Sequence, residues 1–265
     1  MPARAPGYVI AQLSDVHCGD PRFDEKLMLR VVREVNEALP DLVIVPGDLT
    51  AMGYAEQFRE FVAYLDLIEC PRRVVIAGNH DCRNVGDRLF ERIVGTRNTC
   101  VTCDFPPDGR NGRLKVLAVD SNIPDLNDGE IGREKTARIR DEFGEGDTFK
   151  LFVLHHHLVS IPRTGRERNV VWDAGDVLEA LRDAEVDLVL AGHKHVPYSW
   201  PVAELLVVTS GTAASHRTRG ESAPSYNLLR VTRDAIEVTV RDSAGDGAFT
   251  ETFPRRARGR TAPSR

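Results

Sequence analysis

Short apolar runs alternate with amphipathic stretches along the first two thirds of the chain. Residues 8–13 form a mostly apolar run typical of a buried strand, and residues 23–39 follow with apolar side chains three or four positions apart, the spacing of a helix face. Further strands are predicted at residues 42–45, 73–77, 114–119, 150–154 and 187–190, and further helices at 55–67, 133–143 and 176–184. Because apolar strands separated by helices are typical of parallel sheets covered on both faces, this region predicts a mostly parallel sheet.

The last third of the chain has a different pattern. Strand-like segments recur at residues 204–209, 226–232, 235–241 and 248–253 with little helix between them. They predict a second, largely antiparallel sheet packed beside the first. No break in composition and no internal repeat marks a linker. We therefore expect an α/β fold, a two-sheet β-sandwich flanked by helices, formed by a single domain over residues 1–253.

Charge is distributed unevenly. The formal net charge is -5, but residues 254–265 hold five arginines and no acidic residue, which leaves 30 basic against 40 acidic residues in the rest of the chain. An acidic body argues against a nucleic-acid partner, since such partners require Lys and Arg to neutralise phosphates. The arginine-rich segment 254–265 is predicted to be a disordered tail.

Composition also bears on location. No apolar run approaches the ~20 residues that span a bilayer, and the first residues lack the apolar stretch of a signal peptide. Five cysteines, an odd number, favour reduced thiols over a disulfide framework. We therefore expect a cytoplasmic protein with no membrane span. The oligomeric state is not encoded in the pattern, although an antiparallel C-terminal sheet would offer an edge for a dimer.

Polar side chains collect where the predicted strands end. The segments that follow five of these strands contain seven of the eight histidines: residues 14–17 (SDVH), 46–48 (PGD), 78–81 (GNHD), 155–157 (HHH) and 191–195 (AGHKH). In α/β sheets, ligands bind outside the carboxyl ends of parallel strands, so we expect these segments to converge on one rim. A single Asp or His after a strand is commonly a turn former, but its recurrence at strand after strand favours a metal site.

The types of candidate ligand restrict which metal ions the site would bind. Carboxylate, amide and imidazole groups without thiolate favour Mn, Fe or Zn, and they argue against a cysteine-rich structural zinc site. Seven candidate side chains are too many for one ion with an open position, and two ions about 3.5–4 Å apart that share a carboxylate would use them all. The candidates are Asp15, His17, Asp48, Asn79, His193, His195 and one of the three consecutive histidines.

These motifs resemble a known family. D-x-H at 15–17, G-D at 47–48, G-N-H-D at 78–81, a strand-end histidine and G-H-x-H at 192–195 occur in the order found in the calcineurin-like metallophosphoesterases. The chain is most similar to the bacterial class III cyclic-nucleotide phosphodiesterases. The resemblance implies a four-layer α/β/β/α sandwich with a dinuclear metal centre.

The resemblance also implies a ligand set. One metal ion would be held by Asp15, His17, Asp48 and His195. The other would be held by Asp48, Asn79, His193 and the histidine of the fourth motif. That motif commonly reads H-x-P, and Leu158 stands at the proline position here, which indicates His156 as the ligand and His155 as the alternative.

The function implied is a phosphodiesterase that cleaves cyclic nucleotides or small phosphodiesters by attack of a metal-bridging hydroxide. His80 would assist catalysis as a general acid or by binding a phosphate oxygen. Further candidates for contact with a ligand or with the substrate are Asp81, which would orient an imidazole, His155, and the loop residues His216 and Arg217.

Two alternatives stay open. A phosphomonoesterase or a nucleotide pyrophosphatase would use the same centre, because the motifs build the phosphate-cleaving site and the loops select the rest of the substrate. A non-catalytic, protein-binding scaffold on the same fold is an alternative of another class, although scaffolds of this kind typically lack ligands that are all present here.

Overall fold

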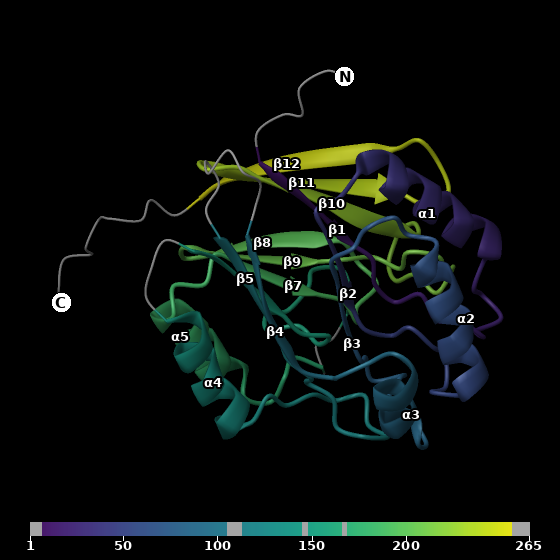
Figure 1. Cartoon of the computed structure of the whole chain (residues 1–265), viewed down its shortest axis with the longest axis horizontal. Coiled ribbons are helices and arrows are strands. Elements are labelled where there is room, and N and C mark those ends of the chain that lie inside the picture. The colour runs from purple at the N-terminus through teal and green to yellow at the C-terminus, as the bar shows by residue number, and fades with distance from the viewer. Residues whose placement is uncertain (1–6, 105–112, 145–147, 166–168, 256–265) are drawn as a thin grey trace.

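The computed structural model describes residues 7–104, 113–144, 148–165 and 169–255. Its strands form two six-stranded mixed sheets (Figure 1). The first has the order β12 (Ala248–Pro254), β11 (Ala235–Asp242), β10 (Ser225–Val231), β1 (Tyr8–Gln12), β2 (Leu42–Pro46) and β3 (Arg73–Ile76). The second has the order β4 (Thr99–Asp104), β5 (Arg113–Ala118), β6 (Thr148–Val153), β7 (Leu188–Ala191), β9 (Leu205–Thr209) and β8 (Tyr198–Val202).

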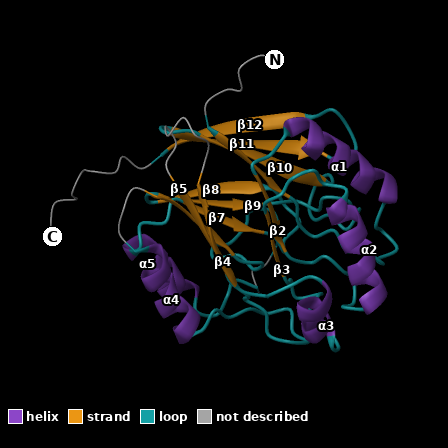
Figure 2. Ribbon diagram, viewed as in Figure 1, coloured by secondary structure: helices purple, strands orange, loops and turns teal. Residues whose placement is uncertain are grey.

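Helices cover the outer faces of both sheets (Figure 2). The helices α1 (Glu25–Ala38), α2 (Ala55–Asp66) and α3 (Gly86–Ile93) pack on the first sheet, and α4 (Arg133–Phe143) and α5 (Ala174–Asp183) pack on the second. A third apolar cluster lies between the sheets, where Ile10 and Ile44 of the first belong with Leu151 and Leu188 of the second. Since strands of both sheets are buried on two faces, the layers are α/β/β/α, as expected.

The C-terminal strands do not form a separate sheet, so that expectation is wrong. Strands β10, β11 and β12 extend the first sheet, where β10 pairs antiparallel with β1, and β9 joins the second sheet parallel to β7. The sequence pattern of β10 does not reveal which sheet the strand joins, because the strand is buried on both faces. Tyr226 on one face packs under the helices, and Leu229 on the other packs between the sheets.

Element boundaries follow local chemistry. Helix α1 begins after Asp24, whose carboxylate accepts hydrogen bonds from the backbone N of Lys26 and Leu27, and it ends at Leu39, whose φ of 49° turns the chain out of the helix. The sequence pattern missed β4, β8 and α3. Strand β8 is an edge strand with mostly exposed or half-buried side chains, so it lacks the apolar signal of a buried strand.

The predicted tail begins too early. Pro254 lies in β12, and the backbone N of Arg255 donates to the carbonyl of Asp234, so these two residues are ordered parts of the sheet edge. Residues 256–265, the rest of that prediction, lie outside the described residues. In the described part of the chain, none of the helices combines the length and apolar character needed to cross a membrane.

Candidate metal centre

The strand ends of both sheets meet at one edge of the sandwich. Asp15, Asp48 and Asn79 follow β1, β2 and β3 of the first sheet, while the histidines of motifs four and five follow β6 and β7 of the second. A hydrogen bond connects the loops of the two sheets: the backbone N of His193 donates to Asp15 Oδ2 at 3.0 Å. The predicted convergence of these segments is thus present in the structure.

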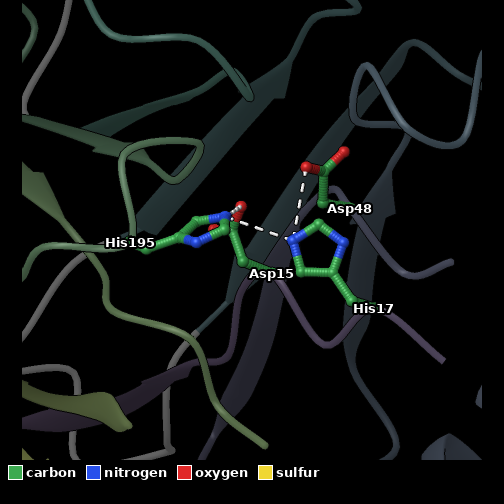
Figure 3. A group of neighbouring side chains, drawn as sticks. All are labelled: Asp15, His17, Asp48 and His195. Carbon is green, nitrogen blue, oxygen red and sulfur yellow. Dashed lines mark hydrogen bonds and ion pairs between the residues drawn. The ribbon is translucent and has the colours of Figure 1, made fainter. Parts of the chain in front are cut away.

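The first group of side chains consists of Asp15, His17, Asp48 and His195 (Figure 3). One ligand atom from each lies within 4.8 Å of the others, and all four side chains are buried. The Nε2 atoms of His17 and His195 are 3.1 Å apart, and His195 Nε2 lies 3.2 Å from Asp15 Oδ1. Asp48 Oδ2 lies 3.7 Å from His17 Nε2. Four donor atoms therefore surround one point.

A second group adjoins the first through Asp48. Asn79 Oδ1 lies 3.0 Å from His193 Nδ1 and 3.1 Å from His155 Nε2. The two imidazole atoms are 3.3 Å apart, and Asp48 Oδ1 lies 3.5 Å from His155 Nε2. The two oxygens of Asp48 thus face different groups.

The expectation that His156 completes the second group does not fit this geometry. Both of its ring nitrogens have other partners: Nδ1 lies 2.8 Å from Ser121 Oγ, and Nε2 lies 3.2 Å from the carbonyl of Asn127. Burial, reinforced by the neighbouring His155, lowers the pKa of His156 to about 3, so its ring is neutral. His155, the alternative, is the imidazole that faces Asn79 and His193.

The chemistry of both groups fits cations. A backbone carbonyl can only accept, so His195 Nδ1 must donate to the carbonyl of Arg217, and His155 Nδ1 must donate to that of Pro46 at 2.7 Å. Each ring then presents a lone pair on Nε2 to carboxylate or amide oxygens. Lone pairs that converge in a buried space repel one another unless a cation lies between them.

Burial and charge act against each other at the carboxylates. Burial raises the pKa of Asp48, but His155, His80 and His17 more than offset this and hold it at about 2. Burial disfavours the charged form of an imidazole as well, and it lowers the pKa of His17 and His193 well below the usual range, so these two rings are neutral. Burial also lowers the pKa of His155, but the adjacent Asp48 and Asp15 outweigh it and raise that pKa, so the buried carboxylates favour positive charge at this point.

The backbone of these loops is unusual. Five ligand candidates adopt the left-handed region: Asp15, His17, Asp48, His193 and His195 have φ values of 53°, 56°, 54°, 71° and 57°. Such conformations turn the chain sharply, so that Asp15 and His17 both reach the first group, whereas His195 reaches the first group and His193 the second. Strained backbone of this kind is concentrated at functional sites.

His80 lies beside the first group. Its backbone N donates to Asp48 Oδ1 at 2.8 Å, its Nδ1 donates to the carbonyl of Ala51 at 2.7 Å, and its ring centroid is 4.7 Å from that of His17. Nε2 can therefore donate a proton only when the ring is an imidazolium. Burial lowers the pKa of His80, which Asp48 partly opposes.

Arg217 faces the same side of the site. Its guanidinium Nη1 lies 3.5 Å from His80 Nδ1 and 3.8 Å from Asp20 Oδ2. Its backbone carbonyl also orients His195, as described above. Arg217 therefore has two contacts with the site: its carbonyl orients His195, and its guanidinium is a cationic group that a phosphate could contact.

Asp81 does not orient an imidazole, contrary to expectation. Its carboxylate accepts hydrogen bonds from the backbone N of Leu49, Thr50 and Gly78 and from Thr50 Oγ1, at 2.7–3.0 Å. It therefore ties the loop after β3 to the loop after β2, which carries Asp48. These hydrogen bonds hold the loop of Asp48 against the loop of Asn79.

His216, a candidate for contact with the substrate, lies outside both ligand groups. Its side chain is 54% exposed, and its Nε2 lies 3.4 Å from Asp24 Oδ2 at the start of α1. The residue lies on the loop of Arg217, but its imidazole faces a helix cap. In the part of the chain that the structure describes, the His216 imidazole pairs with Asp24 and not with a ligand candidate.

Sequence reasoning missed Asn127 and Ser121, which lie behind the second group. Both follow β5, a predicted strand whose carboxyl end also contributes to the rim. The rule that selected the other five segments would have selected Asp120, Ser121 and Asn122 as well. Asn127 lies farther along the same loop and has no such signal.

Comparison with known proteins agrees with this geometry. The calcineurin-like phosphoesterase family model matches residues 8–197, and the chain belongs to that family. It is a metal-dependent phosphoester hydrolase by family. A probable cyclic nucleotide phosphodiesterase of Synechococcus is 28% identical over 70% of this chain and 72% of its own length. A probable glycerophosphodiester phosphodiesterase, GpdQ, of Arcobacter nitrofigilis is 26% identical over 79% of each chain.

Solved structures show the same fold. A purple acid phosphatase isolated from yellow lupin seeds superposes with a TM-score of 0.73 at 14% identity, covering 97% of this chain and 55% of the other. The anchor in the inner membrane complex of Plasmodium superposes with a TM-score of 0.74, also at 14% identity, covering 96% of this chain and 90% of the other. At this identity the likeness concerns the fold alone.

Proposed function

We propose that this protein is a dinuclear metal-dependent phosphodiesterase that acts on cyclic nucleotides or small phosphodiesters. The observation that carries the proposal is the pair of adjoining ligand groups with Asp48 between them. The names of the relatives from Synechococcus and Arcobacter support a diester as substrate.

The proposed ligands of the first ion are Asp15, His17, Asp48 and His195. Those of the second are Asp48, Asn79, His193 and His155, which replaces His156 because of the hydrogen bonds described above. Nitrogen and oxygen ligands of this kind accept Mn, Fe or Zn. When bound, two such ions supply a coordinated water of near-neutral pKa and a Lewis-acid contact to a phosphoryl oxygen.

The remaining roles belong to the protein's own side chains. Arg217 would bind a non-bridging phosphoryl oxygen through its guanidinium, which stabilises the charge that builds up during phosphoryl transfer. His80, as an imidazolium, would donate the proton at Nε2 to the leaving alkoxide, while the hydrogen bond from Nδ1 to Ala51 fixes its ring.

Location and domain organisation belong to the same proposal. Strands from both ends of the described chain lie in one sheet, which supports a single domain that extends through β12 to Arg255. The five cysteines are not joined in disulfides, and reduced thiols support a reducing compartment such as the cytoplasm.

The test compares a diester with a monoester. The purified full chain is assayed with bis-p-nitrophenyl phosphate and with p-nitrophenyl phosphate, with added Mn²⁺ and after chelation. We expect Mn²⁺-dependent cleavage that favours the diester. A preference for the monoester would assign a phosphomonoesterase, and no metal-stimulated activity on either compound would support the scaffold alternative.

Two variants separate the metal centre from general effects of charge. Asp48→Ala is expected to abolish activity and to lose both ions by elemental analysis, because Asp48 lies between the two groups. Asp141→Ala is the matched control, since Asp141 is an exposed carboxylate on α4. A panel of cyclic nucleotides, glycerophosphodiesters and nucleotide diphosphate conjugates then identifies the substrate class.

A further inference from the structure

The amide of Asn79 can face the second group in two ways. Its oxygen has the lone pairs that a metal ion needs, whereas its NH2 group can only donate hydrogen bonds. A rotation of the amide by half a turn would exchange them and leave two hydrogens facing the ion. Some neighbour must therefore fix the orientation of this side chain.

We infer that Arg83 and Asn127 form a hydrogen-bond relay that fixes the Asn79 oxygen toward the second group. This inference rests on the proposed role of Asn79 as a ligand. Asn79 Nδ2 donates to Asn127 Oδ1 at 3.0 Å, and Arg83 Nη2 donates to the same oxygen at 3.2 Å.

Arg83 determines which end of each amide faces its neighbour. A guanidinium has donors and no acceptor, so the atom of Asn127 that faces it must be the oxygen. That oxygen in turn can only accept, so it selects the NH2 of Asn79. The Asn79 oxygen is then left facing His155 and His193, at the distances given above.

Asn127 is held in place from its backbone. Its carbonyl accepts hydrogen bonds from His156 Nε2 at 3.2 Å and from Asn169 Nδ2 at 3.1 Å. The preceding Asp125 joins the loop of Arg83 through two further bonds, from Asn84 N to Asp125 Oδ1 at 2.7 Å and from Asp125 N to the carbonyl of Cys82. His156 thus acts in positioning Asn127 even though it is not a proposed ligand.

Charge alone makes the opposite prediction. Arg83 is a cation near a site for cations, so simple Coulomb repulsion means that removing it should tighten metal binding. The relay predicts weaker binding, because without Arg83 the Asn127 amide can rotate and the orientation of Asn79 is lost. The sign of the effect therefore distinguishes the two.

The experiment measures metal retention. The full chain is loaded with Mn²⁺ and dialysed against graded buffers of free Mn²⁺, and ions per chain are counted by elemental analysis. For Arg83→Met and for Asn127→Leu, we expect the free Mn²⁺ concentration at which the second ion is half lost to rise about tenfold, the lower end of the effect of residues that orient ligands.

Three variants serve as rescues and control. Arg83→Lys keeps a donor and the charge, so it should retain the second ion as the wild type does. Asn127→Asp keeps an acceptor for both partners and adds a negative charge, so it should retain the second ion at least as tightly as the wild type. Arg88→Met removes the same charge from an exposed position on α3, and it should also leave retention unchanged.

The outcomes are distinct. A wild-type chain that never binds a second ion would overturn the proposed function and the relay with it. A wild-type chain that binds two ions, with unchanged or tighter retention in Arg83→Met, would overturn the relay alone. Thermal unfolding of the metal-free variants checks folding, and Arg83→Met, at a half-buried position, carries the test if Asn127→Leu is unstable.

Discussion

Gly78 packs against Asp48 so closely that a Cβ atom on Gly78 would lie 2.2 Å from Asp48 N and 2.3 Å from Asp48 Oδ1. Both atoms belong to the residue that lies between the two ligand groups. The absence of a side chain at Gly78 is therefore a condition for the position of Asp48, and it couples the loop after β3 to the loop after β2.

Gly78→Ala is expected to displace Asp48 and to reduce the metal content of the purified protein by both ions, with loss of activity. The matched control is Gly175→Ala on α5, where a Cβ atom would meet nothing within 4 Å. That control should keep its metal and gain up to about 1 kcal/mol of stability, because alanine favours a helix over glycine. Two full equivalents of metal in Gly78→Ala would contradict the argument.

The adjacent histidines provide a second prediction. His155→Gln is expected to lose one ion per chain and nearly all activity, because His155 Nε2 faces Asn79 and His193. His156→Gln should keep two ions when metal is in excess, because both nitrogens of His156 bond to other groups. Elemental analysis of the two variants checks this, and the reverse result would restore His156 as the ligand.

The role of His80 depends on the leaving group. If His80 protonates the leaving alkoxide, His80→Gln should lower kcat by roughly 10²-fold or more for a diester with a simple alkyl leaving group. The loss should be much smaller for bis-p-nitrophenyl phosphate, since nitrophenolate leaves without a proton. Equal losses on the two substrates would indicate that His80 acts only on the phosphoryl oxygens.

A fourth prediction concerns stability in acid, away from the metal centre. Glu34 on α1 is buried, and its carboxylate accepts hydrogen bonds at 2.8 Å from Arg30 Nε and from Tyr226 Oη. Burial raises the pKa of Glu34, but these two hydrogen bonds outweigh it, and the pKa lies below its ordinary value. Ionised Glu34 therefore stabilises the fold fully above its ordinary pKa of about 4.3, and the contribution is lost as the pH falls further.

Glu34→Gln should thus lower the free energy of unfolding at neutral pH by roughly 1–3 kcal/mol and flatten its decline between about pH 5 and pH 3. Urea unfolding at several pH values measures both effects. Glu37→Gln, which removes an exposed partner of Arg33, should change stability by less than about 0.5 kcal/mol. If the free energy of unfolding of Glu34→Gln declined in acid as steeply as that of the wild type, Glu34 would not be the group responsible for that decline.

Most of the candidate ligands could be predicted because the sequence pattern that indicates them is local. A polar motif directly after an apolar strand places Asp15, Asp48 and His193 at a sheet edge by topology alone. The choice of His156 over His155 rests on the family's H-x-P pattern, in which Leu158 stands at the proline position, and adjacent histidines give no local signal of which ring faces the site. Only the ring contacts in the folded chain separate them: His155 Nε2 lies near Asn79 and His193, whereas His156 Nε2 lies near the carbonyl of Asn127.

Long-range pairing is the part that the sequence does not contain. Residues of β1 pair with residues of β10 more than two hundred positions away, and β10 is buried on both faces, so its pattern fits either sheet. The same limit explains Asn127. It is an exposed asparagine in a loop, with no local pattern to distinguish it from a solvated turn.

The left-handed backbone of five ligand candidates has a consequence for how such a site changes over many generations. Each of these conformations costs an ordinary residue roughly 1–3 kcal/mol, whereas glycine adopts it freely. A mutation to glycine at Asp15 or His195 would therefore remove a ligand and relax the backbone in one step. Selection for folding alone would favour the loss of these side chains, and keeping them requires selection for the function of the site.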